Sequence, residues 1–246
     1  LKRGKNYPQS YNGKMLAKDF FLDLLFPKTC LFCQREGEWL CKDCDSIIET
    51  SDGFHCLCDE PKRLAEPGKC RTCGNHCLNG LYFAVPYQNR FAQKLIRGFK
   101  YEPLIKELAK PLSLFIIKYL RLTEKEFSFA DFVLLPVPLQ KSRLKWRGYN
   151  QSEELAKELS LSFEIPVISD CLMKIKSTLP QVELSEVERE KNLKGAFSVV
   201  NANMARGKKI LLIDDVYTTG ATMQECARVL KQSGAKEVWG MTIARG

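Results

Sequence analysis

The chain has 246 residues, of which 45% are hydrophobic and 10% aromatic, and its formal net charge is +9. This composition excludes wholesale disorder, and the length predicts one α/β domain of ordinary size plus a smaller module. No apolar stretch approaches the roughly 20 residues that cross a bilayer, and the basic N-terminus lacks the apolar segment of a secretory signal. We therefore expect a cytoplasmic protein with no membrane span.

The first 28 residues form a basic lead-in that ends in an amphipathic run, 20–26, closed by Pro27. This run predicts a short docking helix. Nine of the eleven cysteines then lie between Cys30 and Cys77. In a reducing compartment, cysteines at such short spacing indicate metal binding more often than disulfides. We therefore expect residues 1–79 to form a lead-in and a cysteine-rich module, followed by an α/β domain over 80–246.

The first cysteine set consists of two C-x₂-C knuckles, and its members are Cys30, Cys33, Cys41 and Cys44. Four thiolates at this spacing can surround one tetrahedral Zn²⁺. The pattern predicts a zinc site, with disulfides or free thiols as the alternatives.

The second cysteine set is less regular, and its expected ligands are Cys56, Cys58, Cys70 and Cys73. Zinc is the prediction here too, although Cys56 and Cys58 stand one residue closer than in a knuckle. His55 lies three residues before Cys58 and could replace Cys56 as a ligand. At the other end, His76 or Cys77 could compete. The alternative for both histidines is an exposed side chain without a metal, and Cys171 and Cys226 are predicted to be core residues.

From residue 80 onward, segments with a strand pattern alternate with segments of helical period. This alternation predicts a mainly parallel sheet flanked by helices. A polar stretch over 176–193 predicts a long functional loop. The expected strands are 81–85, 132–135, 165–173, 196–200, 209–213 and 237–244, and the expected helices are 91–99, 104–122, 153–161 and 222–232.

A short segment near the C-terminus carries the most specific chemistry. The apolar run 210–213 predicts a buried strand, and Asp214 and Asp215 follow at once. A helix then begins in the turn 218–222, where free N–H groups and the helix dipole suit a phosphate monoester. Gly220 lets the backbone approach the phosphate, and the two acids are placed for ribose hydroxyls.

Two alternatives compete with this interpretation. The strand could end in two solvated acids followed by an ordinary capped helix. It could also be the Walker B strand of an ATPase, but every Gly-Lys pair in the chain lacks the Ser or Thr that completes a P-loop.

Residues 210–222 resemble, at every position, the motif with which type I phosphoribosyltransferases bind 5-phosphoribosyl 1-pyrophosphate (PRPP). Further segments resemble the ComF family of bacteria, which is linked to natural competence: Leu135-Pro136-Val137-Pro138, Arg147-Gly148-Tyr149-Asn150-Gln151, Leu179-Pro180-Gln181, Arg189 with Asn192, and Gly195-Ala196-Phe197. The resemblance runs from about residue 87 to 245 and includes the cysteine pairs ahead of it. It implies an α/β fold, a type I phosphoribosyltransferase core with a small N-terminal double zinc ribbon.

The resemblance also implies the ligands and the site. PRPP with Mg²⁺ would be bound, and 176–189 would be a lid, in which Gln181 and Arg189 are either contacts or plain lid residues. The implied catalytic residues are Asp214, Asp215, Arg147 and Arg189. The implied PRPP-binding residues are Asp214, Asp215, Val216, Tyr217, Thr218, Thr219, Gly220, Ala221, Thr222 and Gly148.

Basic residues alternate through 141–147, and we interpret this stretch as a loop suited to a polyphosphate or a nucleic-acid backbone, with a solvated basic surface as the alternative. Trp146 and Tyr149 could stack on bases or pack the loop down. Two functions follow from the resemblance. One is a PRPP-binding protein that handles single-stranded DNA during uptake, with a helicase of the ComFA type as partner. The other is an active Mg²⁺-dependent phosphoribosyltransferase whose acceptor is unknown.

Overall fold

The computed structural model describes residues 27–126, 128–176 and 193–246. The predicted docking helix over 20–26 lies outside the described residues. So do the predicted lid positions Pro180, Gln181 and Arg189, and Asn192, which carries part of the family resemblance.

The chain divides into two compact units, with the boundary between Asp45 and Ser46. The first unit contains the first cysteine set, and its short helix α2 (Lys42–Ser46) ends at the boundary. The second unit contains the second cysteine set together with the sheet. The division at residues 79 and 80 stays a prediction.

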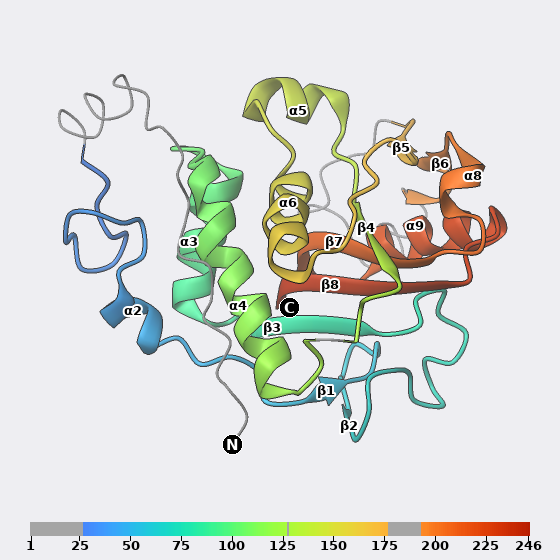
Figure 1. Cartoon of the computed structure of the whole chain (residues 1–246), viewed down its shortest axis with the longest axis horizontal. Helices are drawn as coiled ribbons and strands as arrows, with labels where there is room; N and C mark the ends of the chain where they lie inside the picture. The colour runs from blue at the N-terminus through green and yellow to red at the C-terminus, as the bar shows by residue number, and fades with distance from the viewer. Residues whose placement is uncertain (1–26, 127, 177–192) are drawn as a thin grey trace, which may run out of the picture. The chain divides into compact units, whose positions relative to one another are not determined.

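A parallel four-stranded sheet forms the centre of the second unit, as the sequence predicts (Figure 1). Leu212 of the central strand is paired with Leu135 on one side and with Gly240 on the other. Residues 210–213 are fully buried, which explains their unbroken apolar run. The strands, in spatial order, are β3 (Leu81–Pro86), β8 (Glu237–Arg245), β7 (Lys209–Tyr217) and β4 (Phe132–Pro136).

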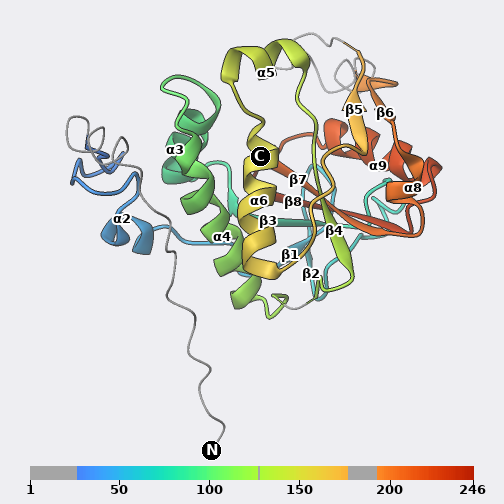
Figure 2. The same ribbon diagram turned by 45° about the horizontal axis from the view of Figure 1, so that its top comes forward.

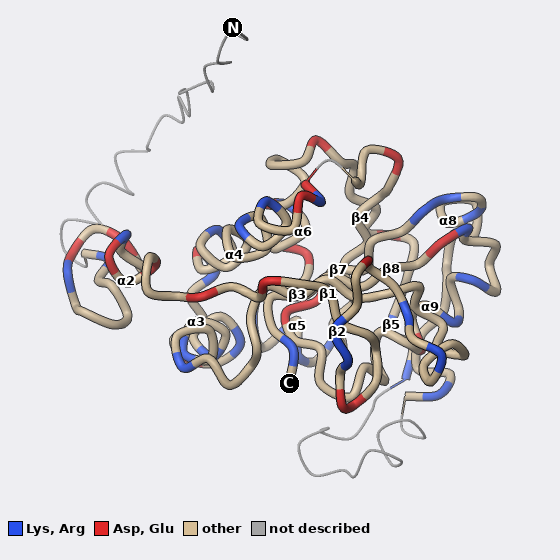
Figure 3. The backbone as a smooth tube through the Cα atoms, turned by 90° about the horizontal axis from the view of Figure 1, so that it is seen from below, with Lys and Arg blue, Asp and Glu red and all other residues tan. Residues whose placement is uncertain are grey.

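Helices cover both faces of this sheet. Helices α4 (Ala109–Leu122) and α6 (Gln151–Phe163) lie side by side on one face (Figures 1 and 2). Helix α9 (Ala221–Gln232) lies on the opposite face, which Figure 3 shows with the sheet between the two layers. The remaining described helices are α3 (Arg90–Lys100), a 3₁₀ turn (Lys106–Leu108), α5 (Lys141–Arg147) and α8 (Ala202–Ala205).

Two short antiparallel pairs stand apart from the main sheet. Strand β1 (Phe54–His55) directly precedes the second cysteine set, and its partner β2 (Arg63–Leu64) lies between Cys58 and Cys70. Strands β5 (Leu172–Lys174) and β6 (Phe197–Val199) pair with each other. The expected strand over 196–200 therefore forms, but it does not join the parallel sheet. Only Val167 of the expected strand 165–173 bridges to β4 in parallel.

One expected element type and two expected boundaries differ from the structure. The basic segment 141–147 is helix α5 and not a loop, because it contains neither Gly nor Pro and its residues are compatible with a helix. Strand β7 continues through Asp214 to Tyr217. Helix α4 begins at Ala109 instead of residue 104, which puts Pro111 in the first turn, where a missing N–H costs little.

The core on the α9 face includes side chains from the cysteine-rich segment. Alternate strand residues such as Leu81, Ile210 and Leu212 pack there with Leu57 and Leu78. As predicted, the remaining cysteines are buried core residues, namely Cys171 and Cys226. None of the helices that the structure describes combines the length and apolarity that a membrane crossing requires.

Candidate functional site

A cavity of ≈ 600 Å³ opens at the carboxyl end of the parallel sheet, which is where open α/β sheets bind ligands. Its floor is the continuous segment 214–223, from β7 into the first turn of α9. The walls come from α3 and the residue after it (Lys100, Tyr101), from α5 (Arg143, Trp146, Arg147) and from the β5–β6 pair (Lys174, Phe197).

The turn Thr218–Thr222, which we call the phosphate turn, is shaped by Gly220. This residue is the N-cap of α9 and has φ 75°, in the left-handed region. A Cβ at this position would collide with the ring of Tyr217. Within the described chain, the amides of Thr219 and Gly220 donate to no other backbone group, and that of Ala221 has only a 3.5 Å contact to Thr219 Oγ1. The turn can therefore receive an anion.

Two acids lie beside this turn and have different partners. Asp215 is 5% exposed, and its Oδ1 is 2.9 Å from Nζ of Lys100. Asp214 Oδ1 accepts hydrogen bonds of 2.9 Å from Ser152 Oγ and from the Asp215 amide. Burial, together with the neighbouring charge of Asp215, raises the pKa of Asp214 to about 7. Asp214 can therefore hold a proton near neutral pH.

Four cations line the cavity together with these two acids: Lys100, Arg143, Arg147 and Lys174. Burial opposes the charge on Lys100, but Asp215 and Asp214 outweigh it and raise the pKa of its ammonium group. Burial lowers the pKa of Arg147. The cavity thus has an excess of positive charge and favours an anionic ligand.

The guanidinium of Arg147 is held by its neighbours at the cavity wall. Its carbon lies 5.6 Å from the ring centre of Tyr101 and 5.9 Å from that of Trp146. Its Nη1 donates to Gln151 Oε1 at 2.8 Å, and its buried Nε has no partner among the described residues. Arg143 and Arg147 are one helical turn apart, so both can line the cavity.

Most of the expected site residues are brought together here. Arg147 and every residue from Asp214 to Thr222 line the cavity. Gly148 ends α5 with φ 79° and is not among the lining residues. Arg189 lies outside the described residues. Sequence reasoning missed Lys100, Tyr101, Ser152, Lys174 and Phe197, because no local pattern links them to the distant Asp214–Asp215 pair.

The two aromatic residues next to α5 behave differently. Trp146 is 53% exposed and lines the cavity. Tyr149 is only 8% exposed, and its hydroxyl donates to the Phe99 carbonyl at 2.7 Å. Tyr149 therefore packs the segment down, whereas about half of Trp146 stays exposed.

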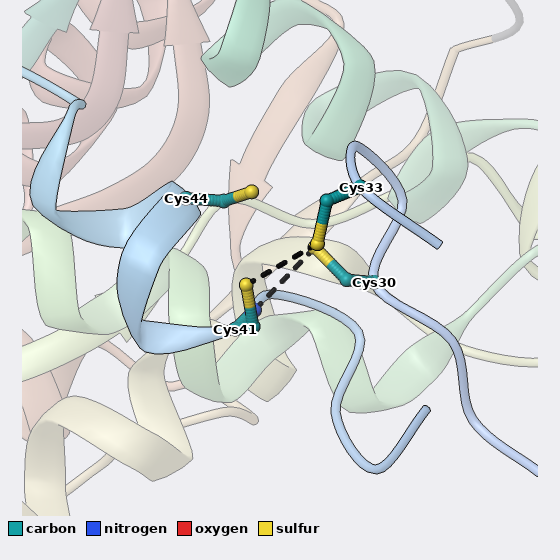
Figure 4. Close-up of side chains that lie close together, drawn as sticks. All are labelled: Cys30, Cys33, Cys41 and Cys44. Carbon is teal, nitrogen blue, oxygen red and sulfur yellow. Dashed lines mark hydrogen bonds between the residues drawn. The ribbon is translucent and has the colours of Figure 1, made fainter. Parts of the chain in front are cut away.

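The four sulfur atoms of the first cysteine set face one another (Figure 4) and lie within 4.8 Å of each other. The Cys41 amide is 3.5 Å from Cys30 Sγ. Burial raises the pKa of the Cys30 thiol, but N–H groups, first that of Cys41, outweigh burial and lower it to about 6. Zn–S bonds of about 2.3 Å in a tetrahedron imply sulfur separations near 3.8 Å, so this set could hold a zinc ion.

The second set brings together the sulfur atoms of Cys56, Cys58, Cys70 and Cys73, again within 4.8 Å of each other. The amide of Lys62 donates to Cys56 Sγ at 3.2 Å. His55 instead packs against Phe83, with the two rings tilted by 49°, and His76 Nδ1 lies 3.0 Å from Gln224 Nε2. The four thiols, without His55, His76 or Cys77, form the group that could hold a second zinc ion.

The chain is similar to a protein family and to several known proteins. A family model described as phosphoribosyl transferase domain matches residues 144–245. Competence protein F of Haemophilus influenzae is 40% identical over 114 residues, which are 45% of this chain and 50% of that protein. The alignment thus spans about half the length of that relative.

Two other relatives are similar over nearly their whole length. Competence protein ComFC of Streptococcus pneumoniae is 28% identical over 87% of this chain and 91% of its own length. DNA utilization protein YhgH of Escherichia coli O157:H7 is 31% identical over 82% of this chain and 94% of its own length. The similarity therefore includes the cysteine-rich region as well as the sheet.

The raised pKa of Asp214 predicts a pH-dependent effect of Asp214→Asn on stability. Since the folded-state pKa of about 7 lies above the unfolded value of 3.8, the folded protein binds more protons than the unfolded chain between these values. Wild-type stability therefore falls as pH rises through this window. We expect the free energy of unfolding of Asp214→Asn to rise by about 1 kcal/mol relative to that of wild type from pH 6 to pH 8.5.

Urea unfolding of the ligand-free proteins at both pH values measures this difference. Asp131→Asn is the matched control, because Lys209 lowers the pKa of that acid and its titration lies below the window. If the difference in the free energy of unfolding between wild type and Asp214→Asn is the same at the two pH values, the raised pKa of Asp214 is contradicted.

Proposed function

Because the chain belongs to the ComF family, we propose that it binds PRPP at the carboxyl end of its sheet and acts in DNA uptake during natural competence. The observation that carries this proposal is the phosphate turn next to the Asp214–Asp215 pair in one cationic cavity. The names of the relatives, competence protein and DNA utilization protein, support the cellular role. The family resemblance adds a helicase of the ComFA type as a partner.

Each part of PRPP has a complementary part of the cavity. The 5-phosphate is bound by the amides and hydroxyls of the phosphate turn, because a helix N-terminus attracts a phosphate monoester. Asp214 and Asp215 accept hydrogen bonds from the ribose hydroxyls. The pyrophosphate lies toward the basic side chains that line the cavity, namely Lys100, Arg143, Arg147 and Lys174. Gly148 and Arg189 remain further predicted contacts. Mg²⁺ bound with PRPP neutralises part of the pyrophosphate charge.

Thr219→Ala tests the phosphate contact. The variant loses a hydroxyl donor to a charged group, and we expect PRPP with Mg²⁺ to bind about tenfold more weakly in isothermal titration. Thr50→Ala is the matched control, because Thr50 does not line this cavity. Wild type that fails to bind PRPP, or equal affinities for the two variants, would refute the proposal.

We also infer that each cysteine set holds one structural zinc ion. Four thiolates bound to Zn²⁺ replace an apolar core in a small module, so the metal contributes directly to folding. The purified chain should contain two zinc ions.

Cys58→Ser should lower the zinc content from two ions per chain to one, measured by elemental mass spectrometry. Cys77→Ser should leave it at two, because Cys77 is not among the four clustered thiols. A zinc content that falls in Cys77→Ser and not in Cys58→Ser would reverse the ligand assignment.

The surface around α5 supports contact with single-stranded DNA. Trp146 is 53% exposed and Tyr101 50% exposed, and Lys141, Arg143 and Lys145 are exposed on the same helix. Exposed aromatic rings among cations are the elements with which proteins bind single strands without sequence preference.

Trp146→Ala should weaken binding of a single-stranded oligonucleotide at least about fivefold, since a base-stacking ring contributes about 1–3 kcal/mol. A gel shift over a range of salt concentrations measures the effect, and binding should weaken as salt rises. Leu144→Ala, on the same helix but without a ring, should bind as wild type does. If wild type does not bind the oligonucleotide at low salt, the proposed contact with single-stranded DNA is refuted.

A second candidate function is transfer of the phosphoribosyl group. It is favoured by the buried acid pair, in which the pKa of Asp214 is about 7, so that this residue can take up a proton from an incoming nucleophile. The bond from the ribose C1 to pyrophosphate would break as a bond to the acceptor forms. We expect pyrophosphate release with at least one member of a panel of nucleobases and amines. If PRPP binds but no member of the panel gives pyrophosphate release, the transfer function is refuted and only the binding function remains.

A further inference from the structure

The second cysteine set is linked to the phosphate turn through Arg245, the last residue of β8. This side chain is 5% exposed. Its two terminal nitrogens donate to the carbonyl oxygens of Cys56 and Cys58, both at 2.5 Å. One planar guanidinium therefore spans the backbone on either side of Leu57, between two of the four clustered thiols.

The same guanidinium contacts the ring that supports the turn. Its carbon lies 5.5 Å from the ring centre of Tyr217 and 5.8 Å from that of Phe83. Tyr217 is in turn the residue whose ring leaves no room for a Cβ on Gly220. A shift of the Cys56–Cys58 backbone would thus be transmitted through Arg245 and Tyr217 to the backbone of the turn.

A second link runs through Gln224, in the first turn of α9. Its Oε1 accepts from the amides of Cys77 at 2.8 Å and Leu78 at 3.1 Å, and its Nε2 lies 3.0 Å from His76 Nδ1. The amide of Gln224 donates to the Gly220 carbonyl at 2.8 Å. The helix turn that begins at Gly220 is therefore attached to the segment that follows Cys73.

Packing connects the same two regions. The apolar side chains of Leu57 and Leu78 belong to one core cluster with Ala221, which lies within the turn, and with Met223, which follows it. Closely packed cores transmit small displacements because they contain few voids.

We propose that Arg245 and Gln224 are positioning residues that couple metal binding at the second cysteine set to phosphate binding at the turn. This inference rests on the proposed binding of PRPP and of zinc. A metal that fixes the backbone at Cys56, Cys58 and Cys73 also fixes the Tyr217 ring and the start of α9. Because coupling between sites is reciprocal, a phosphate in the turn must strengthen metal retention at this set.

Zinc extraction from the full-length, zinc-loaded chain tests the reciprocity. A colorimetric chelator competes for zinc at equilibrium, with and without PRPP and Mg²⁺. We expect PRPP to reduce the release of one of the two ions, equivalent to a zinc affinity at least about fivefold higher, the lower range of coupling between sites. The protected ion should be missing in Cys58→Ser.

Gln224→Ala tests the link itself. It should weaken PRPP binding about fivefold in isothermal titration and abolish the protection of zinc. Gln232→Ala is the matched control, because Gln232 is the same residue type at the exposed end of the same helix. Arg245→Lys is an independent variant that keeps the charge but cannot span both carbonyls; it should show the same loss. Thermal melting verifies that each variant is folded.

Two results would overturn the proposal in distinguishable ways. If wild type binds PRPP but zinc release is unchanged, or if Gln224→Ala binds PRPP as wild type does, the coupling is refuted and the proposed function stands. If wild type does not bind PRPP, the proposed function is refuted and the coupling with it.

Discussion

The passage of β7 into α9 over the ring of Tyr217 is the constraint on which the rest of the site depends. Strand β7 pairs with β4 as far as Ile213, and its pairing with β8 continues to Tyr217, so its end is held in place by β8. Gly220 can cross the Tyr217 ring only because it lacks a Cβ. The first amides of α9 then face the cavity, and the helix dipole adds to their attraction for an anion. A larger residue at 220 would move the turn away from the two acids.

Charge balance is the second determinant of the site. Lys100 holds Asp215 at 2.9 Å, while Asp214 depends on Ser152 and on the amide of Asp215. Both acids are thus oriented before any ligand is bound, and a polar group that is oriented in advance needs little reorganisation when it binds. The surrounding cations keep the cavity attractive to anions, and the exposed ring of Trp146 extends the same surface toward a larger partner.

Patterns of residues close in sequence predicted the features that depend on neighbouring residues. The order of apolar run, paired acids, threonines and glycine identified the strand, the turn and the start of the helix, and cysteine spacing identified both thiol clusters. Helix α5 was predicted wrongly, because charges at every second residue suggest an extended loop, while the same residues place Arg143 and Arg147 on one helical face. Lys100, Arg245 and Gln224 act through partners distant in sequence, and a single sequence contains no signal for such contacts.

A crystal structure of the chain with PRPP and Mg²⁺ tests the central claim most directly. We predict the 5-phosphate against the amides of Thr219 to Thr222, and the ribose hydroxyls within hydrogen-bond distance of Asp214 and Asp215. A phosphoribosyl group bound elsewhere, with the 5-phosphate on α5 or the turn empty, would contradict the account.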